Sequence, residues 1–127
     1  MLVFALLIGT AVPAYKDHLI RARITEGLNL ASAAKLAVTD TAFTNNALPK
    51  TQKETGYMSP APTKYVSSVI IGNSGVVTIS YTKLAGGGTL KLKPILRPNG
   101  ELKWILASDS SLPNKYVPPS LLSKVIT

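Results

Sequence analysis

The spacing of apolar residues changes once along this chain, from a helical period before residue 43 to a strand period after residue 65. Between Ile20 and Ala42, apolar residues recur at intervals of three, four or seven, which is the period of one helix face. Alanine is frequent in this stretch and permits close packing. We therefore predict one helix from about residue 2 to about residue 43. Pro13, four residues after Gly9, should bend this helix or break a turn.

The second half of the chain alternates apolar and polar residues with a period of two. Four such segments, at 65–71, 77–82, 90–93 and 102–106, are separated by glycine-, asparagine- and proline-containing turns. They predict an antiparallel sheet with one apolar face, which needs a cover, and the apolar helix stripe can supply it. The predicted contacts place Ile24, Leu28, Ala31 and Val38 against Val77, Ile79, Leu92 and Trp104.

The predicted fold class is α+β, with a long N-terminal helix packed on a four-stranded antiparallel sheet and an ordered C-terminal strap. A single domain is expected because 127 residues suffice for one hydrophobic core. Its parts are an N-terminal helix (1–43), a connecting loop (44–64), the sheet (65–107) and a C-terminal tail (108–127). Within the helix, residues 1–14 form an apolar assembly or membrane segment, and residues 15–43 form the half that packs on the sheet.

Positive charge is concentrated in the C-terminal part. The chain has a net charge of +8, and residues 50–127 hold ten basic against three acidic residues, a surplus of seven. Such a surplus attracts nucleic acid, anionic lipid or an anionic cell-surface polymer, although it can also serve solubility alone. The candidate contacts for a polyanion are Lys91, Lys93, Arg97, Lys103, Lys115 and Lys124.

The residues needed for most catalytic and metal chemistry are scarce. The chain has no cysteine and one histidine, which excludes thiol catalysis, disulfides, iron–sulfur clusters and zinc-finger sites. The glycine triplet at 86–88 lacks the lysine–hydroxyl pair of a phosphate loop, and no helix is expected after it. We expect no enzyme activity, no catalytic or metal-binding residue and no cofactor.

Three segments resemble the type IV pilins. The apolar start runs into Val12-Pro13-Ala14-Tyr15-Lys16-Asp17, and Ile20-Arg21-Ala22-Arg23 follows. The tail Leu112-Pro113-Asn114-Lys115-Tyr116-Val117-Pro118 is similar to the lysine-tyrosine-proline tail of the type IVa pilins of Gram-negative bacteria. The resemblance covers nearly the whole chain and implies the fold predicted above.

Two departures from the family pattern bear on this resemblance. About nine residues of the mature family N-terminus and the leader are missing, so we expect a truncation at Met1. The first twelve residues, which form the apolar start, would extend only about 18 Å as a helix. About 21 apolar residues would be long enough to span a membrane. Leucines stand where the family has the two cysteines of its C-terminal disulfide. We expect Leu106 and Leu121 to be in contact and to replace that bond.

The resemblance implies a structural subunit of a type IV pilus, which is a homo-oligomeric helical filament on the cell surface. Before assembly such a subunit is held in the inner membrane, and the pilus assembly machinery then packs it into the filament. The residues expected to face other subunits or lipid are Leu2, Val3, Phe4, Leu6, Leu7 and Ile8, and the expected weak point of the helix is at Gly9 and Pro13. Adhesion, twitching motility and DNA uptake are the functions implied.

Two alternatives remain open at this point. The basic surplus favours a pilin-like receptor that binds DNA for uptake, whose binding would fall steeply with salt. A pseudopilin of a type II secretion system is the other alternative. A calcium site near the C-terminus would favour it, yet the tail offers only Asp109 as a carboxylate.

Overall fold

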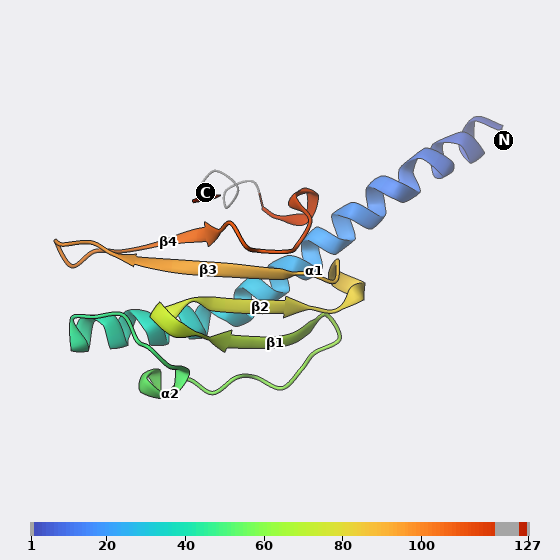
Figure 1. The fold of residues 1–127 in the computed structure, drawn as a ribbon. Helices are drawn as coiled ribbons and strands as arrows, with labels where there is room; N and C mark the ends of the chain where they lie inside the picture. The colour runs from blue at the N-terminus through green and yellow to red at the C-terminus, as the bar shows by residue number, and fades with distance from the viewer. Residues whose placement is uncertain (1, 119–124, 127) are drawn as a thin grey trace.

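One long helix, α1 (Leu2–Asn45), lies across one face of a sheet in this computed structural model (Figure 1). The structure describes the backbone of residues 2–118 and 125–126, and the side chains of residues 15–118. The α+β fold class predicted from the sequence is confirmed. The sequence predicted a bend or a broken turn at Pro13. The backbone is helical on both sides of this residue, so the turn is not broken, and the bend stays a prediction.

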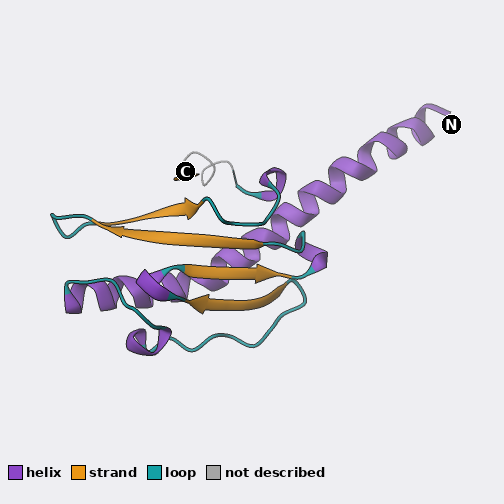
Figure 2. Cartoon of the chain, in the orientation of Figure 1, coloured by secondary structure: helices purple, strands orange, loops and turns teal. Residues whose placement is uncertain are grey.

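The sheet has the strand order β1-β2-β3-β4-β5, and Figure 2 shows its four long strands as a continuous meander. The four predicted strands are present as β1 (Val66–Ile71), β2 (Val77–Tyr81), β3 (Thr89–Leu96) and β4 (Leu102–Ala107), each antiparallel to the next. A fifth strand, β5 (Val125–Ile126), pairs in parallel with β4 and was not predicted. Two residues are too few to show a period in the sequence.

The core lies between α1 and the inward face of the sheet. On the helix, Ile24, Ala31 and Val38 are fully buried, as predicted. On the strands, Val77, Ile79 and Leu92 are buried on the face that meets them. Leu28 and Trp104 are only partly buried, contrary to the prediction. The Trp104 ring lies towards the margin of the core, where the Lys35 ammonium sits 5.4 Å from its centroid.

A short helix, α2 (Gln52–Thr55), interrupts the connection that was predicted to be irregular. The Thr51 hydroxyl accepts a hydrogen bond from the Glu54 N–H, so the Thr-x-x-Glu pattern could have revealed this helix. The Gln52 side chain then reaches the outer edge of β1, where its Oε1 accepts from the Ile71 N–H at 2.9 Å. The Ser59 hydroxyl donates to the Val69 carbonyl at 2.6 Å. The connection therefore covers an edge strand that could otherwise pair with another chain.

Helix and sheet approach each other closely at Gly27, which lies against the ring of Tyr81. A Cβ atom at this position would lie 2.5 Å from the Cε1 and hydroxyl oxygen of Tyr81. The Tyr81 hydroxyl donates a hydrogen bond to the Ile24 carbonyl at 2.7 Å, and the side chain is 5% exposed. A glycine thus makes room for a buried tyrosine that is anchored to the helix backbone.

The stability of the domain should fall at alkaline pH because of Tyr81. Burial, followed by the negative charge of Glu26, raises the pKa of the Tyr81 phenol above its ordinary value of 10.0. The folded state therefore holds a proton that the unfolded state releases above about pH 10. The stabilisation is complete below that pH and should be lost, by up to about 1.4 kcal/mol per pH unit, as the pH rises above it.

Denaturant titrations of the wild type and of Tyr81→Phe between pH 8 and pH 11.5 measure this contribution. At neutral pH the variant should lose about 0.5–1.5 kcal/mol, the net value of the hydrogen bond. Its stability should then fall less steeply above pH 10 than that of the wild type. Tyr15→Phe, at a tyrosine that is 64% exposed, is the control and should follow the wild-type profile. Parallel profiles for the wild type and Tyr81→Phe would contradict the assignment.

Candidate assembly helix and basic sheet face

Helix α1 has a part that is packed on the sheet and a part that is not. Buried positions begin at Ile24 and recur at intervals of three or four residues as far as Ala42. None of residues 15–23 is buried, and the Tyr15 side chain is 64% exposed. Figure 1 shows the N-terminal part of α1 continuing past the end of the sheet. Among the described side chains of α1, the fully buried positions therefore all lie in its second half, and Ile20 packs against the margin of the core.

The predicted assembly residues lie in the N-terminal part of α1. For residues 2–14 the structure describes a helical backbone, whereas their side chains lie outside the described part. The assignments of Leu2, Val3, Phe4, Leu6, Leu7 and Ile8 to packing, and of Gly9 and Pro13 to a weak point, therefore stay predictions. Within the described helices, no stretch is both long and apolar enough to cross a membrane.

Two arginines fasten the middle of α1 to loops from the second half of the chain. The Arg21 Nε donates to the Lys115 carbonyl at 2.7 Å, and the Arg23 Nη1 donates to the Leu84 carbonyl at 2.6 Å. The Arg23 guanidinium also stacks on the Tyr65 ring, 4.5 Å from its centroid. Neither hydrogen bond has a local signal in the sequence, because Lys115 and Leu84 lie 94 and 61 positions away along the chain.

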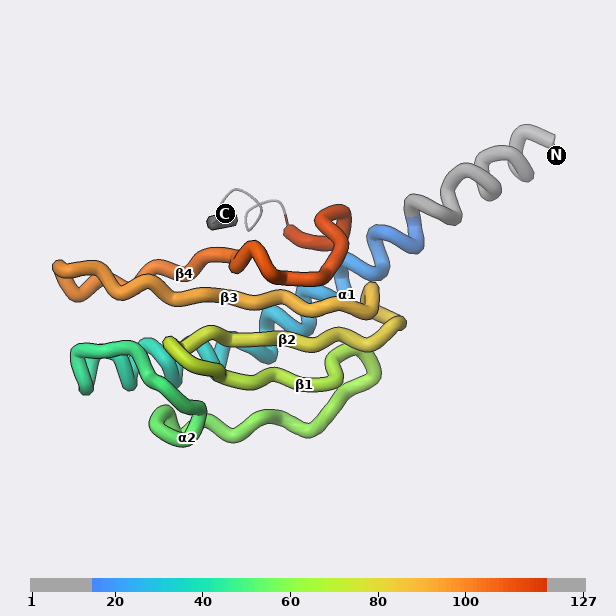
Figure 3. Tube along the Cα trace, in the orientation of Figure 1, coloured from blue at the N-terminus to red at the C-terminus, as the bar shows by residue number. Residues whose placement is uncertain are grey.

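Residues 108–118 are the described part of the predicted strap (108–127), and Figure 3 shows this segment continuing from β4 beside β3 and then curling near α1. The Ser110 hydroxyl accepts from the Lys91 N–H, and the Ser111 hydroxyl accepts from the Thr89 N–H, both at 2.9 Å. Leu112 is buried where the strap crosses the glycine triplet, and a Cβ on Gly88 would lie 2.6 Å from its Cα. The triplet is therefore a crossing point for the strap.

The arginine contact with the strap gives a local prediction. Arg21→Ala removes a charged donor to the carbonyl of Lys115 in η3 (Asn114–Tyr116), so that turn should open more often. We expect faster hydrogen exchange at the Tyr116 and Val117 amides, which bond to carbonyls inside the strap. Because Arg21 is exposed, the global free energy of unfolding should fall by only about 1 kcal/mol.

Lys16→Ala is the matched control for this experiment, because it removes an exposed cation from the same helix but leaves the contact between Arg21 and Lys115 in place. Exchange at Tyr116 and Val117 should then equal that of the wild type. Uniformly faster exchange throughout the sheet in Arg21→Ala would show that the substitution destabilises the whole domain. It would contradict a local role for the Arg21–Lys115 hydrogen bond.

The pair of leucines expected to replace a disulfide is only partly described. Leu106 is 3% exposed and lies in β4, where its register partner in β5 is Val125. Leu121 lies outside the described residues, so its contact with Leu106 stays a prediction.

The predicted basic residues are spread over several surfaces. Lys91 and Arg97 are paired with carboxylates, with the Lys91 Nζ 2.9 Å from the Asp109 Oδ2 and the Arg97 Nη1 3.8 Å from the Glu101 Oε2. The remaining four are Lys93 and Lys103, exposed on β3 and β4, Lys115, whose ammonium lies over the Tyr116 ring, and Lys124, which is outside the described residues.

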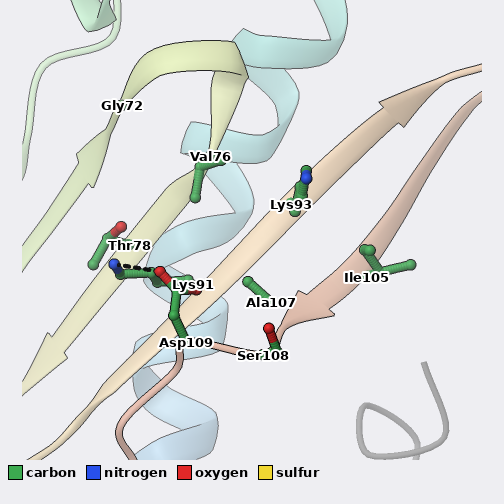
Figure 4. A pocket seen from close by; sticks show the side chains of 9 residues that line it. All are labelled: Gly72, Val76, Thr78, Lys91, Lys93, Ile105, Ala107, Ser108 and Asp109. Carbon is green, nitrogen blue, oxygen red and sulfur yellow. Dashed lines mark hydrogen bonds and ion pairs between the residues drawn. The ribbon is translucent and has the colours of Figure 1, made fainter. Parts of the chain in front are cut away.

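The Lys91–Asp109 ion pair lies on the face of the sheet opposite α1, as Figure 4 shows. The contact with Lys91 holds the pKa of the exposed Asp109 carboxyl below its usual value. In the described part of the chain, no group of three or more histidine, aspartate or glutamate side chains could hold a metal ion.

Comparisons with known proteins place this architecture in a family. A family model described as pilin, a bacterial filament, matches residues 20–121. The fimbrial protein EcpC of Eikenella corrodens is 30% identical over 126 residues, which cover 93% of this chain and 80% of that protein. A type IV major pilin of Neisseria gonorrhoeae is 32% identical over 109 residues, covering 80% of this chain and 66% of that protein. A fimbrial protein of Neisseria meningitidis serogroup B is 32% identical over 108 residues, covering 80% and 63%.

These matches, together with a long helix half covered by an antiparallel sheet, define a structural subunit of a bacterial filament. The chain belongs to the type IV pilin family. It spans slightly less than two thirds of the length of the two Neisseria proteins. Members of this family assemble into multimeric surface filaments, and the family is not one of enzymes.

Proposed function

We propose that this chain is the repeating subunit of a type IV pilus and that the N-terminal part of α1 holds the filament together. The observation that carries the proposal is the division of α1. Its second half forms the domain core with Ile24, Ala31 and Val38, whereas residues 15–23 have no buried position. Residues 1–14, which precede them and are called the N-terminal run below, include no charged residue. Such a run needs an apolar environment that its own domain does not supply.

Two apolar environments can bury the side chains of residues 1–14, one before and one after assembly. Before assembly, the run would sit in the inner membrane, and the assembly machinery would then transfer the subunit to the filament. In the filament, the same side chains would pack against helices of neighbouring subunits. Burial of apolar surface contributes about 25 cal/mol per Å², so several large apolar side chains suffice to hold subunits together. Because the helices would lie inside, the outer face of each sheet would be on the filament surface.

A charged residue in the run tests the proposal. The full-length gene carrying Leu6→Lys, numbered as in this chain, should restore no surface filaments to a strain that lacks the gene. Lys53→Gln is the control, because this exposed residue of α2 lies outside the run, and filaments should be normal. Immunoblots of sheared surface fractions and of whole cells separate failed assembly from failed expression. Normal filament yield with Leu6→Lys would contradict the proposal.

Adhesion, twitching motility and DNA uptake are finer proposals that rest on the filament. DNA binding has one specific observation in its favour, which is that Lys91, Lys93 and Lys103 come from the adjacent strands β3 and β4. Asp109 neutralises one of them. A DNA receptor should bind duplex DNA with an affinity that falls steeply between 50 and 200 mM salt. The secretion pseudopilin is the weaker alternative, because the matched relatives are pilins and fimbrial proteins.

A further inference from the structure

A half-open groove of about 530 Å³ crosses β2, β3 and β4 on the face of the sheet opposite α1 (Figure 4). This volume is in the range of sites for small ligands. Lys91 and Lys93 line the groove because they alternate along β3 with Leu90 and Leu92, which are buried on the opposite face. The strap contributes Asp109 from the segment that follows β4.

The charges in the groove are few and of both signs. Lys91 is held by Asp109 at 2.9 Å. Lys93 is exposed and makes no ion pair or side-chain hydrogen bond with any residue described in the structure. Among the described residues, the groove therefore has two cations and one carboxylate, a net charge of +1, together with the hydroxyl of Ser108.

This composition suits a sparsely charged ligand rich in hydroxyl groups better than it suits a nucleic acid. Duplex DNA carries one negative charge per about 1.7 Å of helix axis, and Asp109 would repel such a backbone. Single-stranded nucleic acid binds by stacking its bases on aromatic rings, and no aromatic residue is among those that line the groove. A carboxylate among lysines and hydroxyls can instead accept hydrogen bonds from a polyol.

We propose that the groove binds a carboxylated sugar unit of a linear anionic polysaccharide. Lys93 pairs with the sugar carboxylate, while Asp109 and Ser108 bond to sugar hydroxyls. The half-buried side chains of Val76 and Ala107 lie under the apolar face of the ring. In the filament of the proposed function, repeated copies would add avidity for a long polymer.

Calorimetric titration of the full chain with a hyaluronan tetrasaccharide, in which carboxylated and neutral sugars alternate, tests the site. Lys93→Gln should weaken binding about tenfold, as expected for the loss of a hydrogen-bonded charge pair. Lys53→Gln, which removes the same charge from α2, should leave the affinity unchanged. The methyl ester of the oligosaccharide should bind about as weakly to the wild type as the free acid binds to Lys93→Gln. Absence of binding at millimolar concentration, or equal effects of the two lysine variants, would overturn the proposal.

Asp109→Asn separates this site from a general polyanion site, because the two predict opposite signs. For a sugar that donates hydrogen bonds from its hydroxyls to Asp109, the substitution weakens binding of the hyaluronan tetrasaccharide severalfold. For a polyanion it removes repulsion, so binding of a short single-stranded oligonucleotide strengthens. If Asp109→Asn strengthens binding of both ligands, the groove is a general anion site and the proposal is wrong. These measurements are made on the chain in solution, so their failure would leave the filament role untouched.

Discussion

Replacing Gly27 by alanine is expected to lower the free energy of unfolding by about 1–3 kcal/mol, although the same change in an ordinary helix raises it by about 1 kcal/mol. The sign reverses because the new Cβ would lie 2.5 Å from the ring of Tyr81. That ring cannot move aside easily, because it is 5% exposed and bonded to the Ile24 carbonyl. Gly27→Val should cost more, since it adds two further carbon atoms to the same space. Denaturant titration measures both changes.

Two comparisons isolate the packing conflict from helix propensity. Asn29→Ala, at an exposed position of the same helix, should leave stability unchanged or slightly higher. In a Tyr81→Leu background, Gly27→Ala should cost less than in the wild type, because the ring it collides with is gone. A gain in stability from Gly27→Ala in the wild type would mean that helix and sheet are further apart than described.

Removing residues 1–14 should convert a self-associating protein into a monomer that keeps its fold. Among the described side chains of α1, which begin at Tyr15, the first buried position is Ile24, so we expect the core to form without residues 1–14. Its apolar side chains should instead bring copies of the chain together through the burial of apolar surface. In sedimentation experiments the full chain should form large assemblies. The 15–127 fragment should sediment as one monomeric species, lighter than the 13.5 kDa of the full chain. The melting temperature should fall by no more than a few degrees.

Met58→Ser is the matched control for this deletion. Met58 is the most exposed large apolar residue described, at 86%, and it lies in the connection beside β1. Its replacement should leave self-association unchanged if association depends on the N-terminal run. An unfolded or aggregated 15–127 fragment would place the run in the core of the domain and would weaken the filament account.

The helix and the four antiparallel strands could be predicted because each is long enough to show its period. Residues 20–42 repeat at helical spacing, and pairs such as Val77 and Ile79 alternate with polar neighbours. The short elements α2 and β5 span four and two residues, below the length at which a period is visible. The positions of Leu28 and Trp104 at the margin of the core depend on where the sheet ends relative to the helix, which periodicity does not specify.

The excess of basic residues on the candidate surfaces could be predicted from the sequence, whereas their contacts in the folded chain could not. The charge surplus drew attention to Lys91 and Lys93, because net charge is a property of the sequence, and their role as ligand contacts stays a prediction. The neutralisation of Lys91 by Asp109 joins residues 18 positions apart through the return of the strap. The Arg21 contact with Lys115 spans 94 positions. Contacts of this kind depend on tertiary packing, so a single sequence gives no local signal for them.

The filament role has its most direct test in electron microscopy of sheared surface fractions from the source bacterium. The account predicts thin filaments in the parent strain, none in a strain without the gene, and their return on complementation. Antibody raised against the 15–127 fragment should label these filaments along their whole length, because the sheets would form the filament surface. Unchanged filaments in the deletion strain, or label confined to the cell body, would contradict the claim that this chain is the repeating subunit.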